Sequence, residues 1–440
     1  MLVQLRTRFE AYRLYLLMEF GIGVCLGMAF ATVVVYRVED AHLSPLDLVL
    51  LGTVLETAYF VLQLPTGVLA DAVSRRLSIV VGIAVLGGAF VMEGLLPFFL
   101  GIAAAQVVCA LGFALVTGAQ EAWIADEVGQ KGLTRVYLRG SQAGLVGTLL
   151  GTVMSAGVAT IGHHLPLIFA GAALVVIAGL LFLTMPETRR ADAAGEADPD
   201  TKAAEPKGMW RNAMDSLGTV ARLIRTGPGV LVVLTVVLVI GVWHESLDRL
   251  WGAHFLENYS FPDLLGLNSV AWFSVMSFGA TLFGLGATQV VNKYVDDATA
   301  SRTTLRMLFV LITLLMGTTF LFAFAGAFYL ALVAYWAAMA LRPSYAPLLN
   351  AWLMERTTER ARATMLSAKD MFDSTGQFAG GPVVGYVGSA VSLRAALATA
   401  AAALAPALAL LGYAMSRRVA QPAEPAAPHP EGRTGLEVGQ

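Results

Sequence analysis

The sequence of 440 residues carries little charge, because aspartate, glutamate, lysine and arginine together make up 14% of it. Soluble domains average about 25% charged residues, and the hydrophobic share of this chain reaches 57%. A chain this apolar cannot cover a surface that faces water, so much of it must face lipid. The net charge of −2 provides no basic field for nucleic acid, and we expect no such partner.

Cysteine is almost missing as well. Cys25 and Cys109 lie far apart inside apolar runs, which excludes a disulfide framework and a cysteine-based metal site. The sequence also lacks a G-x-x-x-x-G-K-(S/T) phosphate loop, an H-E-x-x-H pair and a nucleophile elbow. We therefore expect no enzyme activity, no metal site and no cofactor.

Long apolar runs are what the sequence does contain. A membrane-spanning helix needs about 20 mostly apolar residues. The runs that reach this length are 14–36, 46–70, 77–96, 98–120, 137–161, 165–185, 229–256, 268–291, 303–323, 326–349, 364–388 and 391–415. They predict an all-α integral membrane protein with twelve transmembrane helices in two pseudo-symmetric six-helix bundles.

The basic residues predict the orientation. With the N-terminus in the cytoplasm, every lysine and arginine except Arg37, Arg249, Arg342 and Arg394 falls in a cytoplasmic loop or tail. Because positive charge is retained on the cytoplasmic side, we expect both termini inside. The location that this predicts is a prokaryotic plasma membrane, the inner membrane, crossed many times.

Two segments differ from the membrane runs. Residues 187–227 begin with a stretch of Ala, Asp, Glu, Lys and Pro and predict a flexible cytoplasmic linker. Residues 419–440 are polar and rich in Pro and Ala, which predicts a disordered tail. The linker separates an N-terminal bundle, 1–186, from a C-terminal bundle, 228–418.

The two halves resemble each other. EAWIADE at 121–127 aligns with NAWLMER at 350–356, and at nearly the same shift along the chain Glu19 falls on Glu245. Asp71 falls on Asp296 at a similar shift. Internal repeats are typical of transporters, whose binding site lies near mid-membrane between the repeats.

Residues 67–77, GVLADAVSRRL, resemble the signature loop of the major facilitator superfamily, G-x-L-A-D-(R/K)-x-G-(R/K)-(R/K). The resemblance implies a secondary transporter whose two bundles rock about a central cavity. It assigns Gly67, Asp71, Arg75 and Arg76 to a gating loop, in which the arginines can pair with Asp126 or its neighbour. The alternative is that the two arginines only set the orientation.

Residues 376–385, GQFAGGPVVG, resemble the G-x-x-x-G-P-x-x-G motif that drug:proton antiporters of this superfamily carry in their fifth span. In this chain the motif lies in the eleventh predicted span. The fourth span lacks the antiporter arginine and has Gln106 as its nearest polar residue. The positions that the motif predicts to pack closely between the bundles are Gly376, Gly380, Gly381, Pro382 and Gly385.

Ionisable side chains inside spans cost about 2.5–3.5 kcal/mol on insertion scales, so they are functional by default. The seventh span carries Glu245, Asp248 and Arg249, of which Glu245 and Arg249 are spaced to pair on one helix face. We predict that the two acids handle protons or another cation and that Arg249 sets their affinity. A structural ion pair is the alternative.

Three further charges lie in other spans. Glu56 in the second span is the next candidate for proton coupling, although a partner such as Arg342 would satisfy it. Arg342 itself, in the tenth span, is predicted to hold an anionic group of the solute. Glu19 in the first span is included because it aligns with Glu245.

These features favour proton-coupled export of a small drug-like or metabolite molecule. Proton-coupled uptake or a facilitator stays open, as does a receptor or scaffold of transporter fold without flux. The expected partners are the solute, protons and the lipid bilayer, and we expect a monomer.

Overall fold

The computed structural model describes residues 2–72, 74–129, 133–186, 228–263, 269–297, 301–354 and 362–416. All regular secondary structure in these ranges is helical. The predicted linker at 187–227 and the predicted tail at 419–440 lie outside the described residues.

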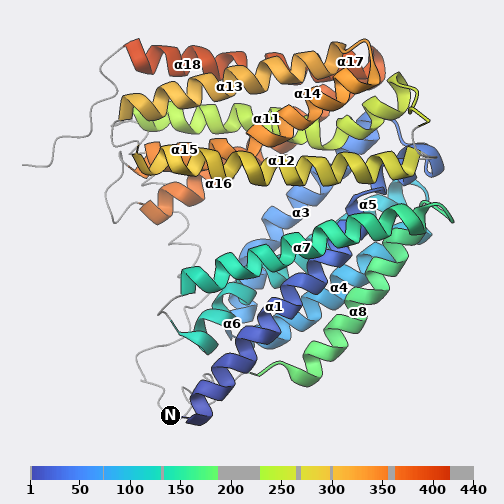
Figure 1. Cartoon of the computed structure of the whole chain (residues 1–440), viewed down its shortest axis with the longest axis vertical. Coiled ribbons are helices and arrows are strands. Elements are labelled where there is room, and N and C mark those ends of the chain that lie inside the picture. Colours follow the sequence, from blue (N-terminus) through green and yellow to red (C-terminus); the bar gives the residue numbers. More distant parts are fainter. Residues whose placement is uncertain are drawn as a thin grey trace, which may run out of the picture.

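The helices form two groups that follow each other in the chain (Figure 1). The first group comprises α1 (Leu2–Phe30), α2 (Val33–Val35), η1 (Tyr36–Asp40), α3 (Pro45–Ala72), α4 (Arg75–Leu95), α5 (Phe99–Val116), α6 (Ala119–Val128), α7 (Leu133–Ala159) and α8 (Leu165–Thr184). The second comprises α11 (Pro228–Asn258), α12 (Ser269–Asp297), α13 (Ser301–Phe324), α14 (Phe328–Leu341), η2 (Arg342–Ser344), α15 (Tyr345–Met354), α16 (Arg362–Ala390), α17 (Leu393–Ala402) and α18 (Ala405–Ser416).

Ten segments of the described chain are long and apolar enough to cross a membrane. The predicted runs 326–349 and 364–388 are not among them. The first is interrupted by η2, which leaves α14 with 14 residues and α15 with 10. The second coincides with α16, a helix of 29 residues that is diluted by glycines and polar side chains. The chain is thus a multi-pass membrane protein, and the count of twelve spans stays a prediction.

Serine, proline and glycine set the helix ends. Ser74 caps α4, because its Oγ accepts a hydrogen bond from the Leu77 N–H at 3.0 Å. Pro97 lies between α4 and α5 and separates two apolar runs that nearly fuse in the sequence. Gly118 has φ of 79°, a conformation that glycine adopts without strain, and it divides α5 from α6.

Within each group the long helices pack side by side. In the first group α1 lies against α7 and α8, and α4 lies against α5 and α8. In the second group α11 lies against α16, and α13 lies against α14 and α17. The groups touch through α3 with α11 and α16, and through α7 with α12. They lie together at one end and diverge toward the end that carries the N-terminus (Figure 1).

A glycine contact fixes the crossing of α1 and α7 in the first group. A Cβ atom added at Gly23 would overlap the backbone of Gly144, and one added at Gly147 would overlap the carbonyl oxygen of Phe20. Both helices therefore approach until backbone meets backbone, which only glycine permits.

The second group repeats this contact between α11 and α16. A Cβ atom at Gly241 would overlap the carbonyl oxygen of Asp373, and one at Gly376 would overlap that of Leu238. The two crossings use glycines at matching places, so each group is built around the same pair of helices.

The matching contacts define the register of the repeat. Gly147 corresponds to Gly376, and this shift along the chain equals the one between segments 121–127 and 350–356. Gly23 corresponds to Gly241, which is a smaller shift. With the smaller shift Glu245 matches Gly27 in α1, and Glu19 matches a valine. The predicted equivalence of Glu19 and Glu245 is therefore wrong by about two helical turns.

Glycines of the predicted packing motif face two directions. Gly376 and Gly380 lie against α11, at Leu238 and Val242, so they pack within the second group and not between the groups. Gly381 and Gly385 lie against Val49 of α3 and do pack between the groups. Pro382 lies inside α16, directly after Gly381.

We expect Gly376→Ala to destabilise the protein. The added methyl group would overlap the α11 backbone, and overpacking of this kind costs about 1–3 kcal/mol. The measurement is the midpoint of thermal unfolding of purified protein in detergent. Gly286→Ala is the matched control, because nothing lies within 4 Å of a Cβ atom at that position of α12. Equal unfolding midpoints for the two variants would contradict the packing described above.

Candidate functional site

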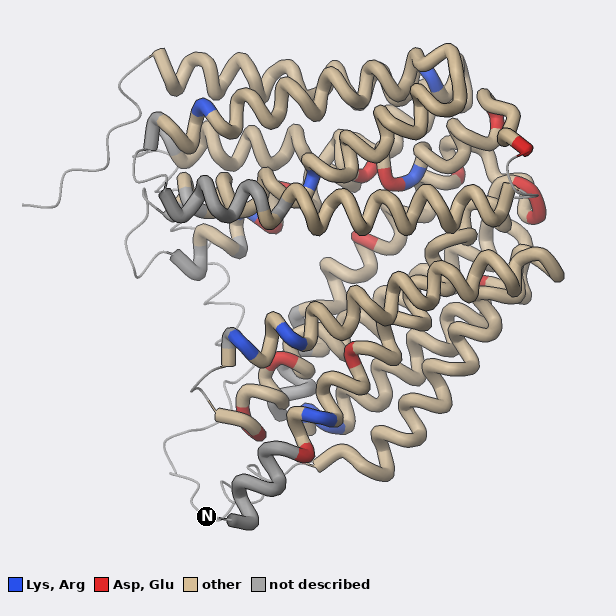
Figure 2. Tube along the Cα trace, in the orientation of Figure 1, with Lys and Arg blue, Asp and Glu red and all other residues tan. Residues whose placement is uncertain are grey.

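Most charged residues of the described chain lie toward helix ends, but residues of both signs also gather midway along the second group (Figure 2). This cluster lies where α3 of the first group meets α11 and α16. Charges are expensive in the hydrocarbon layer, so their partners decide what the cluster can do.

The first ion pair joins Glu245 and Arg249 on α11. Arg249 Nε donates to Glu245 Oε1 at 2.9 Å, and the Glu245 side chain is only 3% exposed. The sequence predicted this pairing from the i,i+4 spacing. Gly52 of α3 faces the pair, and a Cβ atom at Gly52 would overlap Glu245 Oε1 and Arg249 Nε. The ion pair therefore packs directly against the α3 backbone of the first group.

The second ion pair joins Asp248 of α11 to Arg342 in η2. Arg342 Nη1 donates to Asp248 Oδ1, and Nη2 donates to Oδ2 at 2.8 Å, a bidentate geometry that suits the planar guanidinium. η2 holds Pro343 at its centre, and this local break places Arg342 opposite α11. Glu56, the partner that the sequence suggested for Arg342, does not form this pair.

His244 belongs to the same cluster. Arg342 Nη2 contacts His244 Nε2, so the imidazole lies against the guanidinium of the second ion pair. Its Nδ1 atom is buried and forms no hydrogen bond within the described chain.

Glu56 lies on α3, one turn beyond Gly52, and is half-buried. It is within electrostatic range of both Glu245 and Arg249. Among the described residues it has no hydrogen bond or ion pair of its own. Glu56 is therefore the carboxylate that the first group presents to the Glu245–Arg249 pair.

Asp373 of α16 is a member that the sequence reasoning missed. Its Oδ2 accepts from Gln377 Nε2 at 2.8 Å, while its buried Oδ1 has no partner within the described chain. Lys369, one turn earlier on α16, and Arg342 both lie within electrostatic range of it. The signal in the sequence was a carboxylate in a glycine-rich helix, nine residues from the start of the predicted span 364–388. With Asp373, four carboxylates face the two arginines of the cluster.

Glu19 does not join this cluster. It lies on α1, where Gln120 Nε2 of α6 donates to its Oε1. Its partner is thus within the first group.

The predicted gating loop is described in part. Arg75 pairs with Asp126 of α6, as predicted. Arg76 instead donates to the carbonyl oxygen of Phe182 on α8, with its guanidinium 5.7 Å from the centre of the Phe182 ring. Gly67 and Asp71 lie in α3, but their side-chain environment is outside the described part of the chain. Both arginine contacts stay within the first group.

A separate charged network lies wholly inside the first group. Arg37 Nη2 pairs with Glu93 Oε1 at 2.7 Å, and Gln106 Nε2 donates to Glu93 Oε2 at 2.7 Å. All three residues are buried. Gln106, the polar residue that the sequence offers in the fourth predicted span, thus satisfies a carboxylate and holds α5 to α4.

The chain matches the family model of the Major Facilitator Superfamily over residues 15–341, and it belongs to that family. Members of the family and the similar solved structures are transporters, not enzymes. No curated protein sequence matches the chain.

Solved structures share its fold at low sequence identity. The nucleoside transporter NupG is 13% identical with a TM-score of 0.71, and the match covers 92% of this chain and 98% of NupG. A POT family transporter in complex with a thioalcohol-conjugated peptide is 12% identical with a TM-score of 0.71, covering 93% and 96%. A bacterial homologue of the human lysosomal transporter Spinster is 16% identical with a TM-score of 0.64, covering 92% and 96%.

We expect Gly52→Ala to weaken the contact between the groups. The methyl group would push α3 away from the Glu245–Arg249 pair. The measurement is cross-linking between cysteines introduced in place of Leu46 and Ser389. In the native protein the Leu46 backbone N–H donates to Ser389 Oγ at 2.9 Å, at the end where the groups meet. Cys25 and Cys109 are first replaced by alanine.

The cross-linking yield should fall several-fold in this variant. Gly157→Ala is the control, since a Cβ atom there meets nothing within 4 Å. An unchanged yield in Gly52→Ala would show that α3 tolerates the displacement and that the contact is not set by glycine.

Proposed function

We propose that the protein is a proton-coupled secondary transporter of a small organic solute, with twelve spans in two bundles and both termini in the cytoplasm. The observation that carries the proposal is the surplus of carboxylates over arginines where the two groups meet. Glu245 and Asp248 each have an arginine, whereas Glu56 has no cation of its own. A surplus negative charge in the membrane must be matched by a proton or by the solute.

The pairing changes the order of the candidates. The sequence favoured Glu245 and Asp248 as proton carriers, but each has a guanidinium within hydrogen-bonding distance. Glu56 therefore becomes the first candidate for the proton. Arg249 sets the affinity of this carboxylate, because it is the cation of the cluster within electrostatic range of Glu56. Arg342 is occupied by Asp248, so an anionic solute group would have to displace a bidentate pair.

Glu56 and Arg249 lie on different groups, and this gives a route for coupling. Alternating access moves one group against the other around the site. Motion of α3 along α11 would separate Glu56 from Arg249 and leave a lone carboxylate, which then takes up a proton. With the N-terminus in the cytoplasm, the described conformation would open to that side, because the groups diverge there (Figure 1).

We propose export as the direction of transport, because residues 376–385 of α16 resemble the glycine–proline motif of drug:proton antiporters. The solved relatives are named as nucleoside and peptide transporters, which supports a small polar organic solute.

A thermal-shift panel of nucleosides, dipeptides and cationic drugs would identify the solute. Its accumulation in inverted vesicles with an acidic lumen, from which protons leave as the solute enters, would support export, whereas loss of preloaded solute together with protons would indicate uptake. Solute binding without any flux would indicate a receptor.

We expect Glu56→Gln to abolish gradient-driven accumulation in proteoliposomes and to keep exchange of the solute across the membrane. A glutamine at this position cannot carry the proton, although it preserves size and polarity. Glu257→Gln is the control, because Glu257 is an exposed acid near the end of α11. Full pH-dependent accumulation by Glu56→Gln would refute the assignment and return Glu245 and Asp248 to first place.

A further inference from the structure

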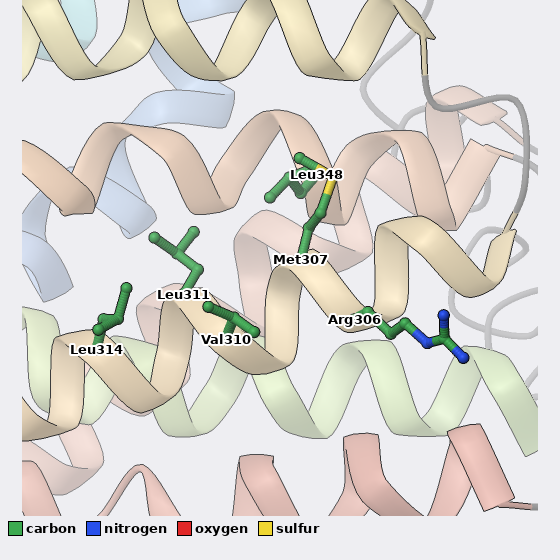
Figure 3. Close-up of a pocket in the computed structure, with 6 residues that line it drawn as sticks. All are labelled: Arg306, Met307, Val310, Leu311, Leu314 and Leu348. Carbon is green, nitrogen blue, oxygen red and sulfur yellow. The ribbon is translucent and has the colours of Figure 1, made fainter.

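A shallow groove of about 330 Å³ lies between α13 and α15, away from the charged cluster. Figure 3 shows the side chains that line it, which are Arg306, Met307, Val310, Leu311, Leu314 and Leu348. Leu311 and Leu348 are buried and form its floor, whereas Val310 and Leu314 are 56% and 47% exposed at its rim. Residues 303–324 of α13 are long and apolar enough to span the membrane, so the exposed rim faces lipid.

Arg306 is the only ionisable side chain in this lining. It is exposed, and among the described residues it has no hydrogen bond or ion pair. It lies close to the start of the apolar span at Thr303, which is the level of the lipid headgroups. From Arg306 to Leu314 the helix rises about 12 Å, at about 1.5 Å per residue. The groove is thus charged at the membrane surface and apolar along its course into the hydrocarbon layer.

We propose that this groove binds a phospholipid with an anionic headgroup. Its phosphate contacts the Arg306 guanidinium, and one acyl chain lies along Val310, Leu311 and Leu314. The charge of Arg306 complements the headgroup, and the apolar walls match the chain. A peptide segment of this chain fits less well, because its backbone polar groups would lie unpaired against lipid.

Native mass spectrometry of the purified full-length protein tests the proposal. The protein is titrated with dioleoyl phosphatidylglycerol or dioleoyl phosphatidylcholine, which share their acyl chains and differ in charge. We expect several-fold more retained phosphatidylglycerol than phosphatidylcholine. Arg306→Gln should remove this preference, and Arg306→Lys should keep part of it. Arg394→Gln is the control, since Arg394 is an exposed arginine at the start of α17.

A second variant tests the apolar part of the groove. Leu314→Trp fills the groove and should lower retention of both lipids, whereas Leu321→Trp on the same helix lies outside the lining and should not. Two results would overturn the proposal. They are an unchanged preference in Arg306→Gln and an equal loss in Arg394→Gln.

Discussion

A charge between helices in a membrane needs a neighbour of opposite sign, and this constraint determines how the spans of the protein are arranged. Arg37 and Glu93 join η1 to α4 in the first group. Arg342 joins η2 to α11 in the second. In each case an arginine and a carboxylate from different helices meet, and the Arg37–Glu93 pair is buried. Each pair fixes the depth of one helix against another, because a slip by one turn would leave both charges unpaired.

Packing within the groups and packing between them use different means. Inside each group, glycines bring the backbones of α1 and α7, and of α11 and α16, into direct contact. Between the groups, α3 meets α16 mainly through Val49 against glycines, and it meets α11 at an ion pair. Backbone contact resists sliding, whereas side chains against glycine leave a smooth surface. This difference is what a protein needs if each group moves as one body.

The sequence predicted features that depend on short spacing or on a family motif. The Glu245–Arg249 pair follows from a helix repeat, and the Arg75–Asp126 pair follows from a loop next to a helix end. The Asp248–Arg342 pair joins residues far apart in the chain, and no local sequence pattern predicts it. Hydropathy likewise found the long spans but could not show that η2 interrupts one of them.

The repeat shows why a single alignment shift was insufficient, since equivalent glycines lie closer together in sequence on α1 and α11 than on α7 and α16. The chain is therefore longer between α11 and α16 in the second copy than between α1 and α7 in the first. A search at one shift finds the later match and misplaces the earlier one. Gly52 and Asp373 escaped prediction for a related reason, since their importance lies in what another helix places beside them.

Gly27 and Glu245 occupy equivalent positions, and their difference describes how the two copies have diverged. In α1 the glycine lets α7 approach at Thr148, whereas in α11 the same position carries a buried carboxylate that reaches α3. Duplicated genes begin with identical helices, and one copy can acquire new chemistry while the other preserves the scaffold. A larger side chain at Gly27 would therefore overlap the α7 backbone, whereas loss of the Glu245 carboxylate would leave Arg249 without its ion-pair partner.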